Sequence, residues 1–109
     1  MQDPKNTPLE QGVSLWRKDQ NACANVPHTR VHHSPTGFEW GYGGSGPAEL
    51  AYNILLAYFD ARVAQRHYQD FKWKFITPLP ENGGFIPKTD IVKWIEEQQQ
   101  NSFTFTNDS

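Results

Sequence analysis

Glycine is concentrated in one short segment of the chain, between a group of aromatic residues and an apolar run. Residues 38–47 are FEWGYGGSGP, and residues 48–59, AELAYNILLAYF, follow them. Glycine permits backbone conformations and close approaches that other residues resist. The chain must therefore turn sharply here or let another group come close to its backbone. Both reasons predict a strand-to-helix junction, around which the other elements must be arranged.

The apolar run after the glycines predicts a central helix. Pro47 suits the first helical position because its missing N–H is not needed there. Gly46 would be the N-cap, and Glu49 would lie in the first turn, where the helix dipole favours a carboxylate. The apolar residues of 50–59 follow helical spacing on more than one face, so we expect a helix that the rest of the domain covers on several sides.

The region before the glycines predicts strands. Residues 13–18, VSLWRK, form a short strand with Val and Leu on one face. Residues 34–37, SPTG, have Ser, Pro and Gly where a type I turn favours them. The segments 28–33 and 38–42 on either side of this turn would then pair, which predicts a β-hairpin over residues 28–42.

The second half of the chain predicts a strand between helices. Residues 60–69 continue the central helix or form a second short one. Residues 71–75, FKWKF, alternate aromatic and lysine residues, which is typical of a half-buried strand. Residues 85–87 form at most a short edge strand. Thr89 suits the N-cap of a final helix, whose buried stripe would consist of Ile91, Trp94 and Ile95.

Together these elements predict an α+β fold, a small antiparallel sheet packed on a central helix, with a C-terminal helix. The length of 109 residues suits one domain. Residues 1–11 are polar with two prolines and predict a flexible arm. The domain would span residues 12–100, and residues 101–109 are predicted to be a flexible tail.

Charge and composition limit the partners that we expect. Ten basic and twelve acidic residues give a net charge of −2, which provides no overall attraction to nucleic acid or membranes. A solvated protein face explains the basic cluster better than nucleic-acid binding does; this cluster comprises Arg62, Arg66, Lys72 and Lys74. No apolar stretch reaches the length of about 18 residues that predicts a membrane span, and no apolar signal-peptide core is present near Met1. We therefore expect a cytoplasmic protein without a membrane partner, and a homo-oligomer stays open.

The glycine segment is the candidate ligand site. Glycine N–H groups can point to one place, and a helix start adds free N–H groups and partial positive charge, so the two could cradle a phosphate. Such a cradle would need positive φ at Gly43 or Gly44. Ser45 could donate its hydroxyl, and Trp40 or Tyr42 could stack on a flat ligand. The predicted ligand-binding residues are Trp40, Tyr42, Gly43, Gly44, Ser45 and Gly46.

A purely architectural role for the same glycines stays open. The segment is neither a Walker A loop nor a G-x-G-x-x-G fingerprint. A tight turn that lets the helix pack against the sheet would account for the glycines equally well.

Other chemistry has weaker support in the sequence. An arginine lies between His28 and His32, and neither C-x-x-C nor H-E-x-x-H is present, so His28, His32, His33 and Cys23 do not predict a metal site. Ser45 lies in GGSGP rather than G-x-S-x-G, which favours a hydrogen-bond donor over a nucleophile. We predict no catalytic residue and no cofactor.

Residues 33–51, HSPTGFEWGYGGSGPAELA, resemble the signature of a family of short proteins of unknown function found in phages and bacterial accessory genomes. The later stretches YQDFKWKFITPLP and IVKWI are similar to the second half of that family. The resemblance covers roughly residues 28–96. It implies a phage-like setting in the cytoplasm of a bacterial host, and it transfers no catalytic residue.

Two functions follow as hypotheses. In the first, the glycine segment and helix start hold a nucleotide-like small molecule, and the protein sequesters a host immune signal. In the second, the chain inhibits a host defence protein by direct contact, and the glycine segment is structural. An enzyme is the third hypothesis, because the sequence contains no recognisable nucleophile–base pair and no metal-binding motif.

Overall fold

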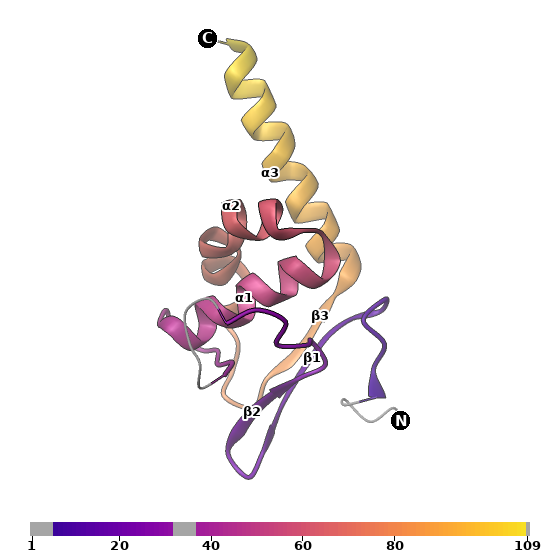
Figure 1. The fold of residues 1–109 in the computed structure, drawn as a ribbon, viewed down its shortest axis with the longest axis vertical. Helices are drawn as coiled ribbons and strands as arrows, with labels where there is room; N and C mark the ends of the chain where they lie inside the picture. The colour runs from indigo at the N-terminus through magenta and orange to yellow at the C-terminus, as the bar shows by residue number, and fades with distance from the viewer. Residues whose placement is uncertain (1–5, 32–36, 109) are drawn as a thin grey trace.

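Strand β1 is the centre of a three-stranded antiparallel sheet, to which the helices are attached. The structure, a computed structural model, describes residues 6–31 and 37–108, with side chains described as far as Gln100. In chain order the elements are β1 (Gly12–Lys18), β2 (Asn21–Ala24), α1 (Ser45–Tyr58), α2 (Ala61–Phe71), the π-helix η2 (Lys72–Ile76), β3 (Gly84–Pro87) and α3 (Lys88–Asp108) (Figure 1).

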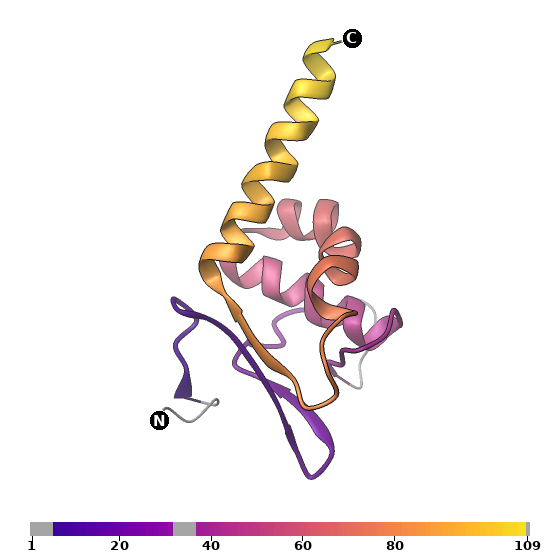
Figure 2. The ribbon, with the colours of Figure 1, turned by 180° about the vertical axis from the view of Figure 1, so that it is seen from behind.

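The sheet has the strand order β2-β1-β3, and one face of it enters the core. Leu15 pairs with Ala24 of β2, and Val13 pairs with Ile86 of β3. Val13, Leu15 and Ile86 are buried in the same cluster as the helices. Figures 1 and 2 show α1 between the sheet and α2. The α+β prediction, with a small antiparallel sheet, a central helix and a C-terminal helix, is therefore confirmed.

Helix α1 is buried on several sides, as its apolar pattern predicts. It begins at Ser45, two residues before the predicted start, with Gly44 as the N-cap. Glu49 consequently lies beyond the first turn. Its side chain is fully buried, and its Oε2 lies 2.5 Å from Nε2 of His28. Glu49 therefore joins α1 to another segment instead of complementing the helix dipole.

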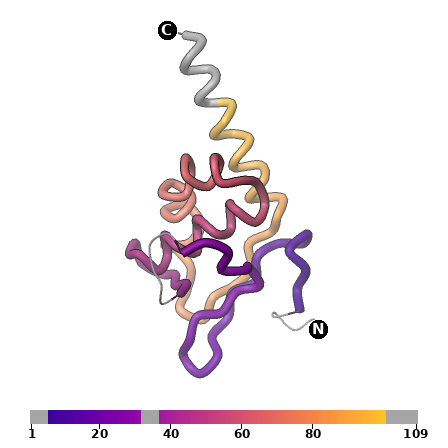
Figure 3. The backbone as a smooth tube through the Cα atoms, in the orientation of Figure 1, coloured from indigo at the N-terminus to yellow at the C-terminus, as the bar shows by residue number. Residues whose placement is uncertain are grey.

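The predicted hairpin over residues 28–42 is wrong. Residues 28–31 and 37–44 contain no strand, and residues 32–36 of the predicted turn lie outside the described residues. Asn53 of α1 accepts a hydrogen bond from the Arg30 amide and donates one to the Arg30 carbonyl, each 3.0 Å long. The backbone of this segment accordingly runs beside α1 (Figure 3). A helix side chain thus satisfies backbone groups that a partner strand would otherwise satisfy.

The hairpin lies earlier in the chain, between β1 and β2. Lys18 pairs with Asn21, so Asp19 and Gln20 form a two-residue connection. Both have positive φ, 52° and 71°, as a type I′ turn requires. The hairpin brings Gln20 and Asn21 close to the glycine segment.

The predicted strand over residues 71–75 is also wrong, because η2 continues the chain in a helical form after α2. Phe71, Lys72 and Ile76 are buried, whereas Trp73 is exposed. Burial at these positions follows a helical spacing and not an alternation. A lysine is expected to face solvent, but Lys72 is buried. Its ammonium group donates a hydrogen bond to the Gly43 carbonyl at 3.1 Å.

Helix α2 is the second short helix that the sequence allows. The Asp60 side chain caps it by accepting a hydrogen bond from the Val63 amide at 2.9 Å. The edge strand β3 confirms the expectation for residues 85–87. Helix α3 begins at Lys88, so Thr89 lies within its first turn and the predicted N-cap is wrong. The buried stripe of α3 contains Ile91 and Ile95 with the partly buried Trp94.

Contacts of the described residues extend into the predicted N-terminal arm, and a helix extends into the predicted C-terminal tail. Tyr58 donates a 2.6 Å hydrogen bond to the Leu9 carbonyl, and Asn25 donates one of 2.9 Å to the Thr7 carbonyl. Burial raises the pKa of Tyr58 to about 12, so this phenol remains a donor throughout the neutral range. Helix α3 continues past Gln100 to Asp108. Mobility of the two ends stays a prediction.

None of the helices in the described part of the chain is both long enough and apolar enough to cross a membrane.

Two adjacent glycines at the start of β3 test this fold. Gly83 has a φ of +90°, and an added Cβ would lie 2.2 Å from the Leu15 carbonyl oxygen, whereas at Gly84 the nearest atom is 3.9 Å away. We expect Gly83→Ala to lower the free energy of unfolding by more than about 1–2 kcal/mol, because the left-handed strain is added to a clash with backbone. Gly84→Ala should change it by less than about 1 kcal/mol. Urea denaturation measures both, and equal losses would contradict this packing of β3 on β1.

Candidate functional site

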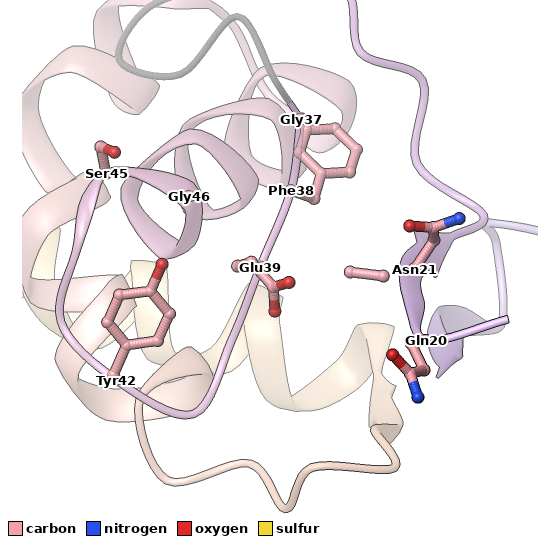
Figure 4. A pocket seen from close by; sticks show the side chains of 9 residues that line it. Gln20, Asn21, Gly37, Phe38, Glu39, Tyr42, Ser45 and Gly46 are labelled. Carbon is pink, nitrogen blue, oxygen red and sulfur yellow. The ribbon is translucent and has the colours of Figure 1, made fainter. Parts of the chain in front are cut away.

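A cleft lies between the tip of the β1–β2 hairpin and the segment that leads into α1, and we call it the hairpin cleft. Its volume is about 330 Å³. Figure 4 shows Gln20 and Asn21 on one side of it, Tyr42, Ser45 and Gly46 on the other, and Glu39 between them. The lining residues are Gln20, Asn21, Ala22, Gly37, Phe38, Glu39, Tyr42, Ser45 and Gly46.

The start of α1 forms one wall of the hairpin cleft. Ser45 and Gly46 are the first two residues of the helix. The N-cap residue is Gly44, which makes no side-chain capping hydrogen bond. The first amides of a helix and its macrodipole favour negative charge. The Ser45 side chain is exposed, so its hydroxyl is accessible at this wall. This side of the cleft can therefore receive an anionic group.

The Arg17 guanidinium binds Glu39, one of the residues that line the cleft. Its Nη1 lies 2.9 Å from one carboxylate oxygen of Glu39 and 3.0 Å from the other. Its Nε donates a 2.8 Å hydrogen bond to the Glu81 carbonyl, and its Cζ lies 4.4 Å from the centroid of the Trp40 ring. The indole of Trp40 donates to the same carbonyl at 3.1 Å. Strand β1, the segment before α1 and the turn before β3 are thereby joined.

The glycines of the segment are required by side chains of this chain that lie against them. An added Cβ would be 2.5 Å from the Trp73 ring at Gly43 and 2.4 Å from the Tyr42 ring at Gly44. At Gly46, it would be 2.7 Å from Cβ of Glu39. The close approach inferred from the sequence therefore exists, and it is made by two aromatic rings and a carboxylate side chain.

The predicted positive φ at Gly43 or Gly44 is wrong. Gly44 has a φ of −88°, and the glycine with positive φ in this segment is Gly41, at +87°. The Gly41 amide donates to the Ile76 carbonyl at 3.1 Å, so the left-handed residue serves the contact with η2. The residue with left-handed backbone therefore precedes the glycine pair.

The structure brings together half of the predicted ligand-binding residues. Tyr42, Ser45 and Gly46 line the hairpin cleft, while Gly43 and Gly44 lie beside it. Trp40 is only 2 % exposed and its ring is covered by Arg17. Of the two aromatic residues predicted to stack on a ligand, only Tyr42, 52 % exposed, lines the cleft.

Sequence reasoning missed Gln20, Asn21 and Glu39 as lining residues. Gln20 and Asn21 precede the glycine segment by about 20 residues, and only the turn brings them close. A signal was present: two residues separate the alternating strand VSLWRK from the next extended segment. Asp-Gln lacks the glycine or asparagine usual in such turns. The backbone of this turn is therefore strained, and it lies at the edge of the cleft. Strained backbone often occurs at functional sites.

The other candidate residues have separate roles. His28 is bonded to Glu49, and its ring lies 4.7 Å from that of Phe38. Cys23 is a free, partly buried thiol. Within residues 6–31 and 37–100, no three potential metal-binding side chains come together, and His32 and His33 are outside that range.

Comparison with known proteins gives one family. Residues 6–97 match DUF6166, a family of unknown function. The match begins before the predicted domain boundary at residue 12 and includes the hairpin cleft, η2 and most of the folded chain. No curated protein and no solved structure matches the chain.

The strained hairpin turn gives a direct test of the cleft's geometry. Gln20→Gly should raise the free energy of unfolding by about 1 kcal/mol, because glycine adopts positive φ without the steric cost that glutamine bears. Gln20→Ala is the matched control, since it removes the same side chain but keeps the strain. Thermal unfolding of both variants measures the difference. A loss of stability in both would show instead that contacts of the Gln20 side chain outweigh the strain.

Proposed function

We propose that this chain, which belongs to the DUF6166 family of unknown function, is a binding protein that holds a phosphate-bearing, nucleotide-like ligand in the hairpin cleft. The observation that carries the proposal is the gathering of a helix start, a hydroxyl, a carboxylate and an exposed aromatic ring around one space of about 330 Å³. Small-molecule sites occupy about 300–1,000 Å³. The cleft is at the lower end of that range, which favours a mononucleotide over a dinucleotide.

The phosphate would bind at the start of α1. The Ser45 hydroxyl and the first helix amides supply donors there, and the helix dipole adds partial positive charge. Pro47 has no N–H, so Ser45 and Gly46 would be the principal amide donors. Hydrogen bonds from such donors to a charged phosphate oxygen are stronger than those to a neutral acceptor.

The sugar would bind toward the hairpin. Glu39 can accept hydrogen bonds from ribose hydroxyls, which is the role of an acidic residue in dinucleotide-binding folds. Arg17 balances its charge and so reduces repulsion of the phosphate. The amides of Gln20 and Asn21 provide further donors and acceptors on the opposite wall, and the Tyr42 ring offers a surface for the base.

A narrower form of this proposal concerns the biological setting. The resemblance of residues 33–51 to phage and accessory-genome proteins supports a role in the cytoplasm of a bacterial host. There the protein would sequester a signalling nucleotide of the host's immune response. Sequestration requires tight binding and no chemical reaction. A preformed cleft favours tight binding, because few side chains have to be ordered when the ligand binds.

A second candidate, an inhibitor that contacts a host defence protein, is favoured by a different observation. Trp73 and Tyr42 are 57 % and 52 % exposed, and their rings lie against the adjacent glycines Gly43 and Gly44. The Lys72 ammonium is 4.6 Å from the Trp73 ring centroid. Supported, exposed aromatic residues are typical energetic centres of protein interfaces. In this case the glycines would support the two rings.

Ser45→Ala tests the first proposal. The variant should keep its stability but bind its nucleotide about tenfold or more weakly, because a hydrogen bond to a charged group contributes about 1.5–3 kcal/mol. Isothermal titration calorimetry with adenosine monophosphate, 3′,5′-cyclic nucleotides and ADP-ribose measures this.

Trp73→Leu is the control, because it keeps an apolar side chain over Gly43 and lies outside the cleft. It should leave nucleotide affinity unchanged. Absence of heat with every nucleotide in the wild-type protein would refute the ligand proposal. If Trp73→Leu no longer binds a stoichiometric protein partner that Ser45→Ala still binds, the inhibitor proposal would be supported.

A further inference from the structure

Backbone groups of β3 face away from the sheet at its outer edge. In the described part of the chain, β3 lies at one end of the sheet and pairs with β1 alone. The Lys88 amide donates to the Gln11 carbonyl at 3.1 Å, and every second pair of an antiparallel ladder is hydrogen-bonded in this way. Ile86 is therefore bonded to Val13. The next residue, Phe85, directs its N–H and C=O away from β1.

The opposite side of β1 gives the same assignment. The Asn25 amide donates to the Ser14 carbonyl at 3.2 Å, so Ser14 faces β2 and its neighbour Val13 faces β3. Among the residues that the structure describes, no hydrogen bond from outside the sheet reaches the backbone of Phe85. The Phe85 N–H and C=O are thus available to an additional strand.

A groove lies between β3 and η2, and we call it the edge groove. Its volume is about 230 Å³, and its apolar lining includes Phe75, Leu79, Phe85, Ile86 and Pro87. None of the described lining residues belongs to β1 or β2, so the groove follows the free edge of β3. Figure 2 shows the chain leaving η2, turning and returning as β3. Small-molecule sites occupy about 300–1,000 Å³, so this groove fits a side chain better than a complete small ligand.

Two exposed charges of opposite sign lie at the edge groove. Lys74 belongs to η2, and Asp90 lies in the first turn of α3, shortly after β3. Neither side chain forms an ion pair with another described residue. The other described lining residues are uncharged. A complementary partner therefore combines an apolar side chain with an acidic and a basic one.

We propose that the edge groove binds an extended peptide segment of another protein, which adds a strand to β3. One apolar side chain of the peptide enters the groove, an acidic residue pairs with Lys74, and a basic residue pairs with Asp90. In this mode of recognition, backbone hydrogen bonds give affinity and pockets for alternate side chains give specificity. The site uses neither the hairpin cleft nor the exposed rings of Tyr42 and Trp73, so it rests on neither function proposed above.

Pro87 makes a foreign segment a better occupant than a second copy of β3. Proline has no N–H and can only accept a hydrogen bond at the edge. Two copies of β3 facing each other would place a proline in both strands. A segment without proline can donate to the carbonyls of both Phe85 and Pro87, and proline at a sheet edge also limits self-association.

Because the partner is unidentified, the test begins with an immobilised library of random heptapeptides with blocked ends. The wild-type protein should select peptides in which an aliphatic or aromatic residue is accompanied by an acidic and a basic residue. In hydrogen-exchange NMR, the selected peptide should slow exchange of the Phe85 amide, because a new hydrogen bond protects it. The Ile86 amide, bonded to Val13, should exchange slowly with and without peptide. N-methylation along the peptide should weaken binding at alternate positions, because every second residue of a strand faces its neighbour.

Phe85→Pro removes the outward-facing N–H and should abolish peptide binding. Phe85→Leu is the matched control, because it also removes the ring but keeps the N–H, and it should still bind. Proline is tolerated at a sheet edge where the N–H faces solvent, and urea denaturation checks that the variant folds.

Lys74→Glu tests the same site if Phe85→Pro fails to fold. It should weaken binding of the selected peptide about tenfold, because an attraction becomes a repulsion. Binding should return when the acidic residue of the peptide is replaced by lysine. Lys93→Glu makes the same change at an exposed lysine of α3 outside the groove, and it should bind like the wild type.

Three results would overturn the proposal: no selected peptide, an unchanged exchange rate of the Phe85 amide, or an equal loss of binding in Lys93→Glu. A dimer in analytical ultracentrifugation that Phe85→Pro abolishes would assign the edge to a second copy of the chain, and this would overturn the proposal as well.

Discussion

The contacts of the Arg17 guanidinium determine how the candidate site is assembled. One planar group binds the Glu39 carboxylate, donates to the Glu81 carbonyl and covers the Trp40 ring. These contacts join three segments that lie far apart in the sequence. A lysine could not replace them, because an ammonium group lacks the planar fork and the stacking surface. Without Arg17, the Glu39 carboxylate would lose its counter-charge, and the position of the hairpin relative to α1 would lose its main polar link.

Regular elements with an apolar period could be predicted from the sequence, whereas segments held by buried polar groups could not. Strand β1 and helices α1 and α3 follow from the spacing of their own residues. Residues 28–31 look like a strand but are bound by Asn53 and Glu49 of α1. In η2, Lys72 looks like a solvent-facing residue but is buried on the Gly43 carbonyl. In both cases a distant partner overrides the local pattern, and nothing in the local sequence identifies that partner.

The candidate site also contains residues that could be predicted from the sequence and residues that could not. Tyr42, Ser45 and Gly46 were predicted because they lie together where the sequence predicts the start of a helix, and the helix is there although the strand expected before it is not. The hairpin residues of the opposite wall were not, since their approach depends on the Asp19–Gln20 turn. The glycines also proved to have a different cause from the one inferred. They make room for Tyr42, Trp73 and Glu39, so they shape a cleft wall and support exposed rings at once. This dual role is why the ligand and inhibitor proposals share one segment.

The central claim is that the hairpin and the start of α1 form two walls of one ligand site. Backbone amide NMR of the wild-type protein, titrated with each nucleotide in turn, tests it most directly. One nucleotide should cause saturable shifts on both walls together, at Gln20 and Asn21 as well as at Ser45 and Gly46. Shifts confined to one wall, or an unchanged spectrum with every nucleotide, would contradict it.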